Sequence, residues 1–217
     1  MAINSDQGFT GQLQPQSGTS DVGAQNFAIA QFLTRVRTAT LVQVKSCTNT
    51  GDVSPVGRVD VLPLVNQLDG SLKAVPHAVI YDVPYLRLQG GTDAVILDPK
   101  PGDIGIAVFA DRDISAVKSS KQQSNPGSGR TFDFADGLYL GGVLNDVPQQ
   151  YIRYYSGGIE IVSPTKIRMA APEIEIAAGS TISVTSPGGD VVVQGISQVT
   201  HVHDGVTSGG STTGGPQ

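Results

Sequence analysis

The feature that most constrains this chain is a short repeat that begins after residue 150. Apolar residues that open successive strand-like segments recur about every eight residues, at Ile159, Ile167, Ile174, Ile182, Val191 and Val199. Each segment alternates apolar and polar residues and then reaches a Gly, Pro or Ser turn, as in GGIEIVSP and EIEIAAGS. The pattern predicts short β-strands arranged as an internal repeat.

A single copy of this repeat cannot cover its own apolar side. The alternation produces one apolar row, formed by the pairs Ile159/Ile161, Ile167/Met169, Ile174/Ile176, Ile182/Val184 and Val191/Val193. An exposed row of that length indicates a partner, and short strands from one chain would leave open edges. We therefore predict a trimeric intertwined β-helix over residues 149–199, a shaft in which three copies bury their rows at a common axis. An ordinary antiparallel sheet packed on the N-terminal domain is the alternative.

The preceding part of the chain predicts a separate β domain. Between residues 40 and 145, β-rich runs are bounded by Gly, Pro, Asn or Asp: TLVQVKSCT, GRVDVLPLVNQ, AVILD, IGIAVFA and LYLGGVL. Five strands of this spacing fit an OB-like β-barrel over residues 36–148, with a small sandwich as the competing fold. Pro101 and Gly102 mark a turn, and residues 118–133 are expected to form a polar surface loop. The predicted fold class is all-β.

Residues 1–35 are interpreted as an N-terminal arm. Residues 1 to about 25 are rich in Gln, Ser and Gly, so we expect them to be extended and ordered only when a partner holds them. The stretch AQNFAIAQFLTRVRTA is the one reasonable candidate for a helix.

Composition excludes several classes of function. The chain of 217 residues has a formal net charge of −5, which argues against nucleic acid as a partner because phosphate binding needs a basic face. No apolar run approaches the ~20 residues of a membrane span, and the N-terminus lacks the pattern of a secretory signal. Cys47 is the single cysteine, so an internal disulfide is impossible and a reducing compartment at synthesis is expected.

Two of the three histidines, His201 and His203, stand one residue apart where the repeat ends. On a strand they would point to the same side. In a trimer, three such pairs bring six imidazoles to the axis, a set that suits an octahedral first-row transition metal. Imidazole must be neutral to bind a metal, so such a site should weaken below about pH 6. We predict a metal-binding apex over residues 200–217. Asp204 could accept a hydrogen bond from an imidazole, although a turn role is favoured for it.

Several motifs occur in an order that resembles one protein family. They are Asp82-Val83-Pro84, the Gly90-Gly91 turn, Pro101-Gly102-Asp103 and the stretch FADRDI at 109–114, followed by the eight-residue repeat and by His-x-His before a Gly/Ser/Thr tail. Over about residues 35–217 the chain resembles the small central spike proteins of contractile-tailed bacteriophages, which are the membrane-piercing tips of their baseplates.

The resemblance implies a function that the residues alone do not specify. It implies a homotrimer whose N-terminal region attaches to a baseplate hub protein, and one iron ion held by His201 and His203 of three chains. By geometry alone, nickel or cobalt would also fit. The expected location is the baseplate tip of the virion tail, and the expected role is to pierce the host outer membrane on contraction. No nucleic acid and no small-molecule substrate are expected.

Other interpretations remain open at this point. The tip of a bacteriocin or secretion-system spike would carry the same features, and a metal-dependent β-solenoid hydrolase or a carbohydrate-binding solenoid is an alternative of another class. An enzyme is not expected, because no catalytic arrangement of Ser/His/Asp, paired carboxylates or Cys/His stands out. His77 is expected to be partly buried. Asp111, Arg112 and Asp113 suggest a solvated edge or an interchain salt bridge more than a Mg²⁺ or Ca²⁺ site.

Overall fold

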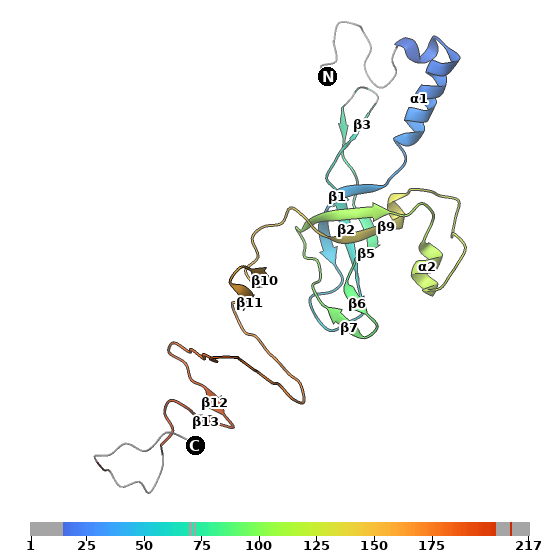
Figure 1. The fold of residues 1–217 in the computed structure, drawn as a ribbon. Helices are drawn as coiled ribbons and strands as arrows, with labels where there is room; N and C mark the ends of the chain where they lie inside the picture. The colour runs from blue at the N-terminus through green and yellow to red at the C-terminus, as the bar shows by residue number, and fades with distance from the viewer. Residues whose placement is uncertain (1–14, 70, 72, 203–208, 210–217) are drawn as a thin grey trace. The chain divides into compact units, whose positions relative to one another are not determined.

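The computed structural model describes residues 15–69, 71, 73–202 and 209 (Figure 1). The chain divides into two compact units, residues 1–148 and 149–217. The described part is mostly β-structure with few helices, which confirms the all-β class. In that part, no helix is both long and apolar enough to cross a membrane.

The described residues of the first unit form two α-helices and two 3-10 turns beside the strands. The elements are η2 (Pro15–Gly18), α1 (Asp21–Leu33), β1 (Ala39–Cys47), β2 (Arg58–Pro63), β3 (Gln67–Leu68), β4 (Ala74–Val75), β5 (Ile80–Pro84), β6 (Leu88–Gly90), β7 (Asp93–Val95), β8 (Ile104–Phe109), α2 (Ser115–Ser120), η3 (Phe134–Asp136) and β9 (Gly137–Gly142). Five of the strands form one sheet in the order β5-β2-β1-β8-β9, while β3–β4 and β6–β7 are separate hairpins.

The five-stranded sheet curls until its two edge strands meet. Tyr85, directly after β5, forms an isolated parallel bridge with Tyr139 of β9. The backbone N–H of Leu86 donates to the carbonyl oxygen of Tyr139 at 2.8 Å. The remaining neighbours in the sheet are all antiparallel. The result is a half-barrel whose concave side can enclose a core.

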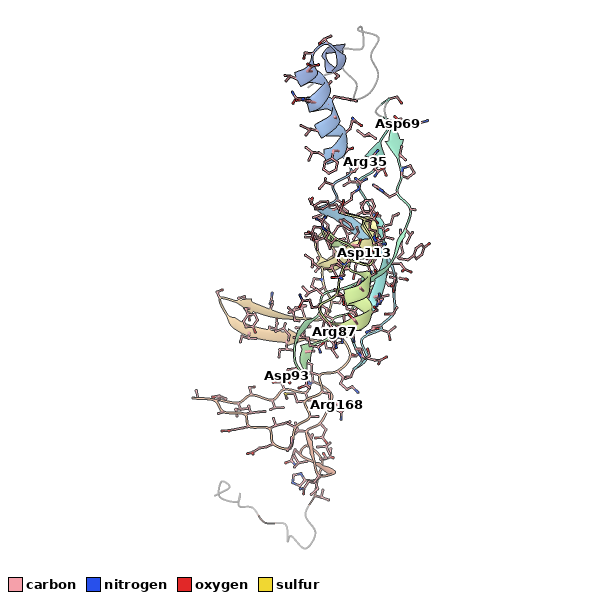
Figure 2. All side chains as sticks on the ribbon, turned by 90° about the vertical axis from the view of Figure 1, so that its right-hand side faces the viewer. Arg35, Asp69, Arg87, Asp93, Asp113 and Arg168 are labelled. Carbon is pink, nitrogen blue, oxygen red and sulfur yellow. The ribbon has the colours of Figure 1, made fainter. Side chains whose placement is uncertain are left out.

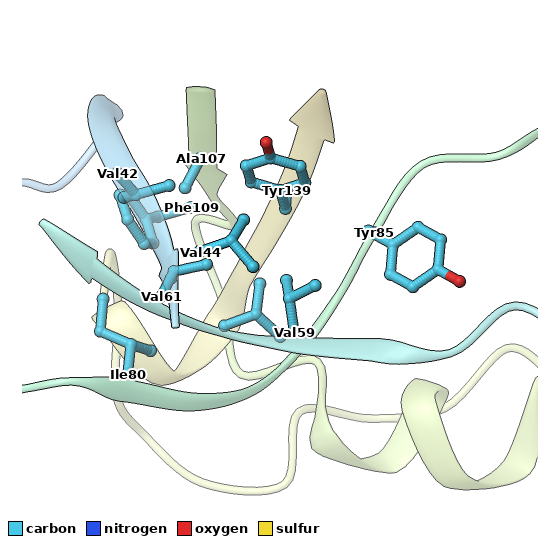
Figure 3. Close-up of a cluster of buried hydrophobic side chains, with 10 residues drawn as sticks. Val42, Val44, Val59, Val61, Ile80, Tyr85, Ala107, Phe109 and Tyr139 are labelled. Carbon is cyan, nitrogen blue, oxygen red and sulfur yellow. The ribbon is translucent and has the colours of Figure 1, made fainter. Parts of the chain in front are cut away.

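The core lies inside that curl. It is built mainly from alternate residues of the strands, which point to one face of the sheet. Figure 3 shows the cluster, which consists of Val42, Val44, Val59, Val61, Ile80, Val83, Tyr85, Ala107, Phe109 and Tyr139. β-branched valines dominate it, as expected for residues that pack well on a pleated surface.

One predicted strand is present in part but does not belong to the main sheet. The run AVILD contributes only to β7, which lies outside the main sheet, and the third strand of the sheet is instead β5. The alternation in β5 is broken because Asp82 has a φ of 63°, and the register against β2 shifts between Val59 and Val61. Such a bulge hides the period-two pattern by which a strand is predicted.

The predicted helix is present with different bounds, and a second helix was not predicted. Helix α1 begins at Asp21, inside the segment expected to be extended, because the Ser20 side chain accepts a hydrogen bond from the N–H of Gly23 and caps it. A second helix, α2, occupies the start of the expected polar loop. The predicted turn at Pro101 and Gly102 is confirmed, with Gly102 at a φ of 100°.

Two charge networks hold the loops of the first unit. Arg87 and Asp98 form an ion pair at 2.7 Å with both side chains 3% exposed, and Tyr85 donates to the same carboxylate at 2.6 Å. The backbone N–H of Gly51 donates to its other oxygen at 2.9 Å. Burial by itself would raise the pKa of Asp98, but these hydrogen bonds hold the pKa below its ordinary value. The network joins the loop after β1 to the segment after β7.

The second network corrects the expectation for Asp113. This residue is not on a solvated edge: it is buried and paired with Arg130 of the same chain at 2.9 Å. Arg130 also binds Asp136, which is fully buried, at 2.7 Å. Hydrogen bonds from Ser115 and Ser128, together with the charge of Arg130, lower the pKa of Asp113 to about 2. Figure 2 labels Asp113 and Arg87, one residue from each network.

The second unit contains four described strands in two hairpins. They are β10 (Tyr151–Tyr155), β11 (Gly158–Val162), β12 (Val192–Val193) and β13 (Ile196–Ser197). The segment GGIEIV was correctly predicted as a strand, whereas residues 163–191, all described, contain none. None of the described residues of this unit, 149–202 and 209, is buried. Strands need hydrogen-bonded neighbouring strands, and no described strand of this chain pairs with residues 163–191.

Candidate metal-binding apex

The hairpin β12–β13 leads the chain to the candidate metal ligands. Val192 pairs with Ser197 and Val193 with Ile196, so Gln194 and Gly195 form a two-residue loop. Both loop residues have positive φ, 50° and 84°, which is the backbone of a type I′ turn. This turn matches the twist of the two short strands, and glycine accepts its second position without strain.

Ser197 organises the segment that follows. Its hydroxyl accepts hydrogen bonds from the backbone N–H groups of Val199 and Thr200, at 3.2 and 2.8 Å. The carboxylate of Asp190 also accepts from the N–H of Val199, at 3.2 Å. Hydrogen bonds from Ser197 and from the neighbouring backbone lower the pKa of Asp190. These contacts close a turn at residues 198–200, where the sequence had predicted a strand.

His201 lies directly after this turn, and its ring is tied to the backbone. Its Nδ1 lies 2.6 Å from the carbonyl oxygen of Ser197. A carbonyl can only accept, so Nδ1 carries the proton and donates it. In the neutral ring the lone pair is then on Nε2, the atom that would coordinate a metal. Metal-binding histidines commonly donate their other N–H to a backbone carbonyl in this way.

Of the two predicted ligands, only His201 lies among the described residues. The contact with Ser197 fixes the tautomer of His201, as a metal ligand would need, and the ligand role itself stays a prediction. His203 and Asp204 lie outside the described residues, so their placement stays a prediction. Within the described residues of one chain, no group of three or more His, Cys, Asp or Glu side chains could hold a metal.

The third histidine has a different environment. His77 is partly buried, as predicted, and its ring packs edge-on against Phe134 with centroids 5.2 Å apart. Its Nε2 lies 3.0 Å from the carbonyl oxygen of Val65. These contacts place His77 among the packing residues of the first unit.

The C-terminal segment matches a known family model. Residues 195–217 match the GpV Apex motif. This motif is associated with phage central spike proteins. The matched segment begins in the β12–β13 turn and contains both His201 and His203, so it supports the resemblance to the central spike family at a coarse level. A comparison of the whole chain with curated proteins found no match.

Proposed function

We propose that this protein is the homotrimeric central spike of a contractile phage tail, and that it pierces the host outer membrane when the tail contracts. The observation that carries the proposal is the position of the histidine pair. It lies within the apex match and directly after a repeat that has no buried side chain in one described chain. A tip that is assembled from several chains accounts for both properties.

The shaft of the spike would be the intertwined β-helix of residues 149–199. In three copies wound together, the strand edges of one chain pair with those of the next, and the apolar rows meet at the axis. Interchain hydrogen bonds and the dry core would then resist bending. The mechanism is mechanical rather than enzymatic.

The apex would be fastened by one iron or another first-row transition metal. His201 and His203 of three chains would hold it, with the tautomer of His201 fixed by Ser197. A pointed end has too few residues for a hydrophobic core, so a metal fastens the three chain ends where packing cannot.

The first unit would attach the spike to the baseplate hub. Its curled five-stranded sheet, closed by the Tyr85–Tyr139 bridge, supports an OB-type barrel, which is a partly open five-stranded Greek-key barrel. Helix α1 has no buried residue and exposes Val22, Ile29, Phe32 and Leu33. An exposed apolar helix in the N-terminal region is a suitable surface for a hub partner.

Mass in solution measured together with metal content tests the proposal. A trimer with one transition metal per three chains is expected. Substituting His201→Ala or His203→Ala should remove the metal and leave the trimer, whereas the control His77→Gln, which changes the third histidine, should keep both. A monomer would contradict the spike. One metal per chain would favour the alternative of a metal-dependent enzyme, since an enzyme site needs its own open coordination position.

A further inference from the structure

The hairpin β10–β11 contains the first strand of the repeat, β11, and has two chemically different faces. Its strands pair in the register Tyr151↔Val162, Ile152↔Ile161, Arg153↔Glu160, Tyr154↔Ile159 and Tyr155↔Gly158. Residues directly opposite each other share a face, and successive residues alternate between faces. One face therefore carries four large apolar side chains, which we name the apolar collar face: Ile152, Tyr154, Ile159 and Ile161.

The opposite face satisfies its own polar groups. The guanidinium of Arg153 forms an ion pair with Glu160 across the two strands. It also lies over the rings of Tyr155 and Tyr151, 4.6 and 5.8 Å from their centroids. An arginine held between two aromatic rings and a carboxylate is a stable arrangement at a solvated surface. This face therefore has no need of a partner and can remain in water.

The apolar collar face has no such cover in the described chain. Tyr154 is 77% exposed, and the three isoleucines are each more than half exposed. A two-stranded hairpin is at best marginally stable in water and needs further strands or a packed apolar face. Because none of the described residues of the second unit is buried, this unit offers its own hairpin no core.

The repeat indicates what covers the face. Ile159 and Ile161 are the first pair of the apolar row that continues through Ile167 and Met169. The collar face is therefore continuous along the chain with the surface assigned to the axis of the shaft. It also lacks charge, as is typical of the buried centre of a homo-oligomeric interface.

We propose that the apolar collar face is the surface through which this chain binds two further copies of itself at the barrel end of the shaft. The inference rests on the proposed trimer and extends it: Tyr154 and Ile152 precede the repeat and become part of the interchain core. Three tyrosine rings meet near the axis there, and the Arg153 face points outward to water.

Two neighbouring tyrosines provide a matched test. In a single chain Tyr155 is half exposed and its ring lies against the guanidinium of Arg153, whereas Tyr154 is 77% exposed. If copies bind through the collar face, Tyr154→Ala in the full-length protein should raise the concentration at which the trimer dissociates by about tenfold or more, because interface aromatics carry much of the binding energy. Tyr155→Ala should leave the dissociation concentration within about threefold of the wild type. The reverse order, or equal effects, would overturn the inference.

Crosslinking gives a readout that does not depend on stability. Tyr154→Cys, treated with a short bis-maleimide, should give covalent dimers and trimers, while Tyr155→Cys and the wild type, which contains Cys47, should give few. If the wild type is a monomer, the proposed function itself fails. If it is a trimer but Tyr154→Cys does not crosslink, the trimer stands and the collar inference fails, as it would if the chain's own barrel or another protein covered this face.

Discussion

The carboxylate of Asp136 accepts a hydrogen bond from the backbone N–H of Ile114 at 3.0 Å, and so joins the end of the loop to the residue before helix α2. The same carboxylate accepts two hydrogen bonds from Arg130, at 2.7 and 3.0 Å. One buried side chain therefore closes the whole segment between β8 and β9.

Replacing Asp136 by alanine should destabilise the first unit. The N–H of Ile114 would lose its acceptor in a partly buried position, which costs about 1–3 kcal/mol. Hydrogen exchange of the β8 and β9 amides would measure the loss. Asp111→Ala, at an exposed position on the same charge run, is the matched control and should change exchange little. Equal exchange in the two variants would contradict the role assigned to Asp136.

Acid should loosen the same region over a narrow range of pH. The pKa of Asp113 is lowered to about 2 in the folded chain, and the pKa of Asp136 is also lowered. A group with a depressed folded pKa contributes stability that is present above its ordinary pKa and is lost as pH falls through the folded value. Melting temperature should therefore be insensitive to these groups above about pH 5 and should fall between about pH 4 and pH 2.

In the variant Asp113→Asn, the melting temperature should fall less steeply between about pH 4 and pH 2 than in the wild type. If the wild-type protein instead lost its stability between pH 7 and pH 5 and lost no more below pH 5, groups other than Asp113 and Asp136 would determine its acid sensitivity.

Gly105 should not tolerate a side chain. It lies on β8 opposite Gly142, and a Cβ atom there would overlap the carbonyl oxygen of Gly141 and the ring of Tyr139. Gly105→Ala should cost about 1–3 kcal/mol through overpacking and should open the β8–β9 pairing. Gly90→Ala is the control, since a Cβ at that position meets nothing within 4 Å. Thermal melting of both variants would decide, and similar melting temperatures would refute the packing argument.

Metal release from the proposed apex should follow the protonation of imidazole. Bound metal should fall as the pH drops below about 6, because a protonated ring cannot coordinate. A chelator at pH 7.5 should have the same effect. Metal analysis and limited proteolysis of the C-terminal end would measure it, with the mass of the assembly expected to stay constant. Metal retained in full at pH 4.5 would exclude histidine ligation.

The sequence predicted those parts of the fold whose pattern is local and regular. The alternation in β1, β2, β8 and β9 identified four strands of the sheet, and β11 and β12 were found from the repeat. It failed at β5, because the positive φ of Asp82 breaks the alternation, and at α2, whose short polar sequence has no amphipathic pattern.

The two candidate ligand residues could be named from the sequence, but the hydrogen bond that holds the ring of His201 could not. His201 and His203 are conspicuous in a chain with few histidines. The role of Ser197 was not visible, because it acts through its backbone carbonyl, a group that every residue has. The pairing of Tyr154 with Ile159 depended on the register of a hairpin, which the period of the repeat does not specify.

The lack of any buried side chain among the described residues of the second unit affects how the protein is made. A newly synthesised copy can complete its valine core alone, since the whole core lies within the first unit. In the proposed trimer, the second half would gain its packing partners from other copies, so it would be completed by a step whose rate depends on concentration. On that proposal, an unassembled copy would keep an accessible C-terminal half, which proteases would cut more readily than the same segment in the trimer.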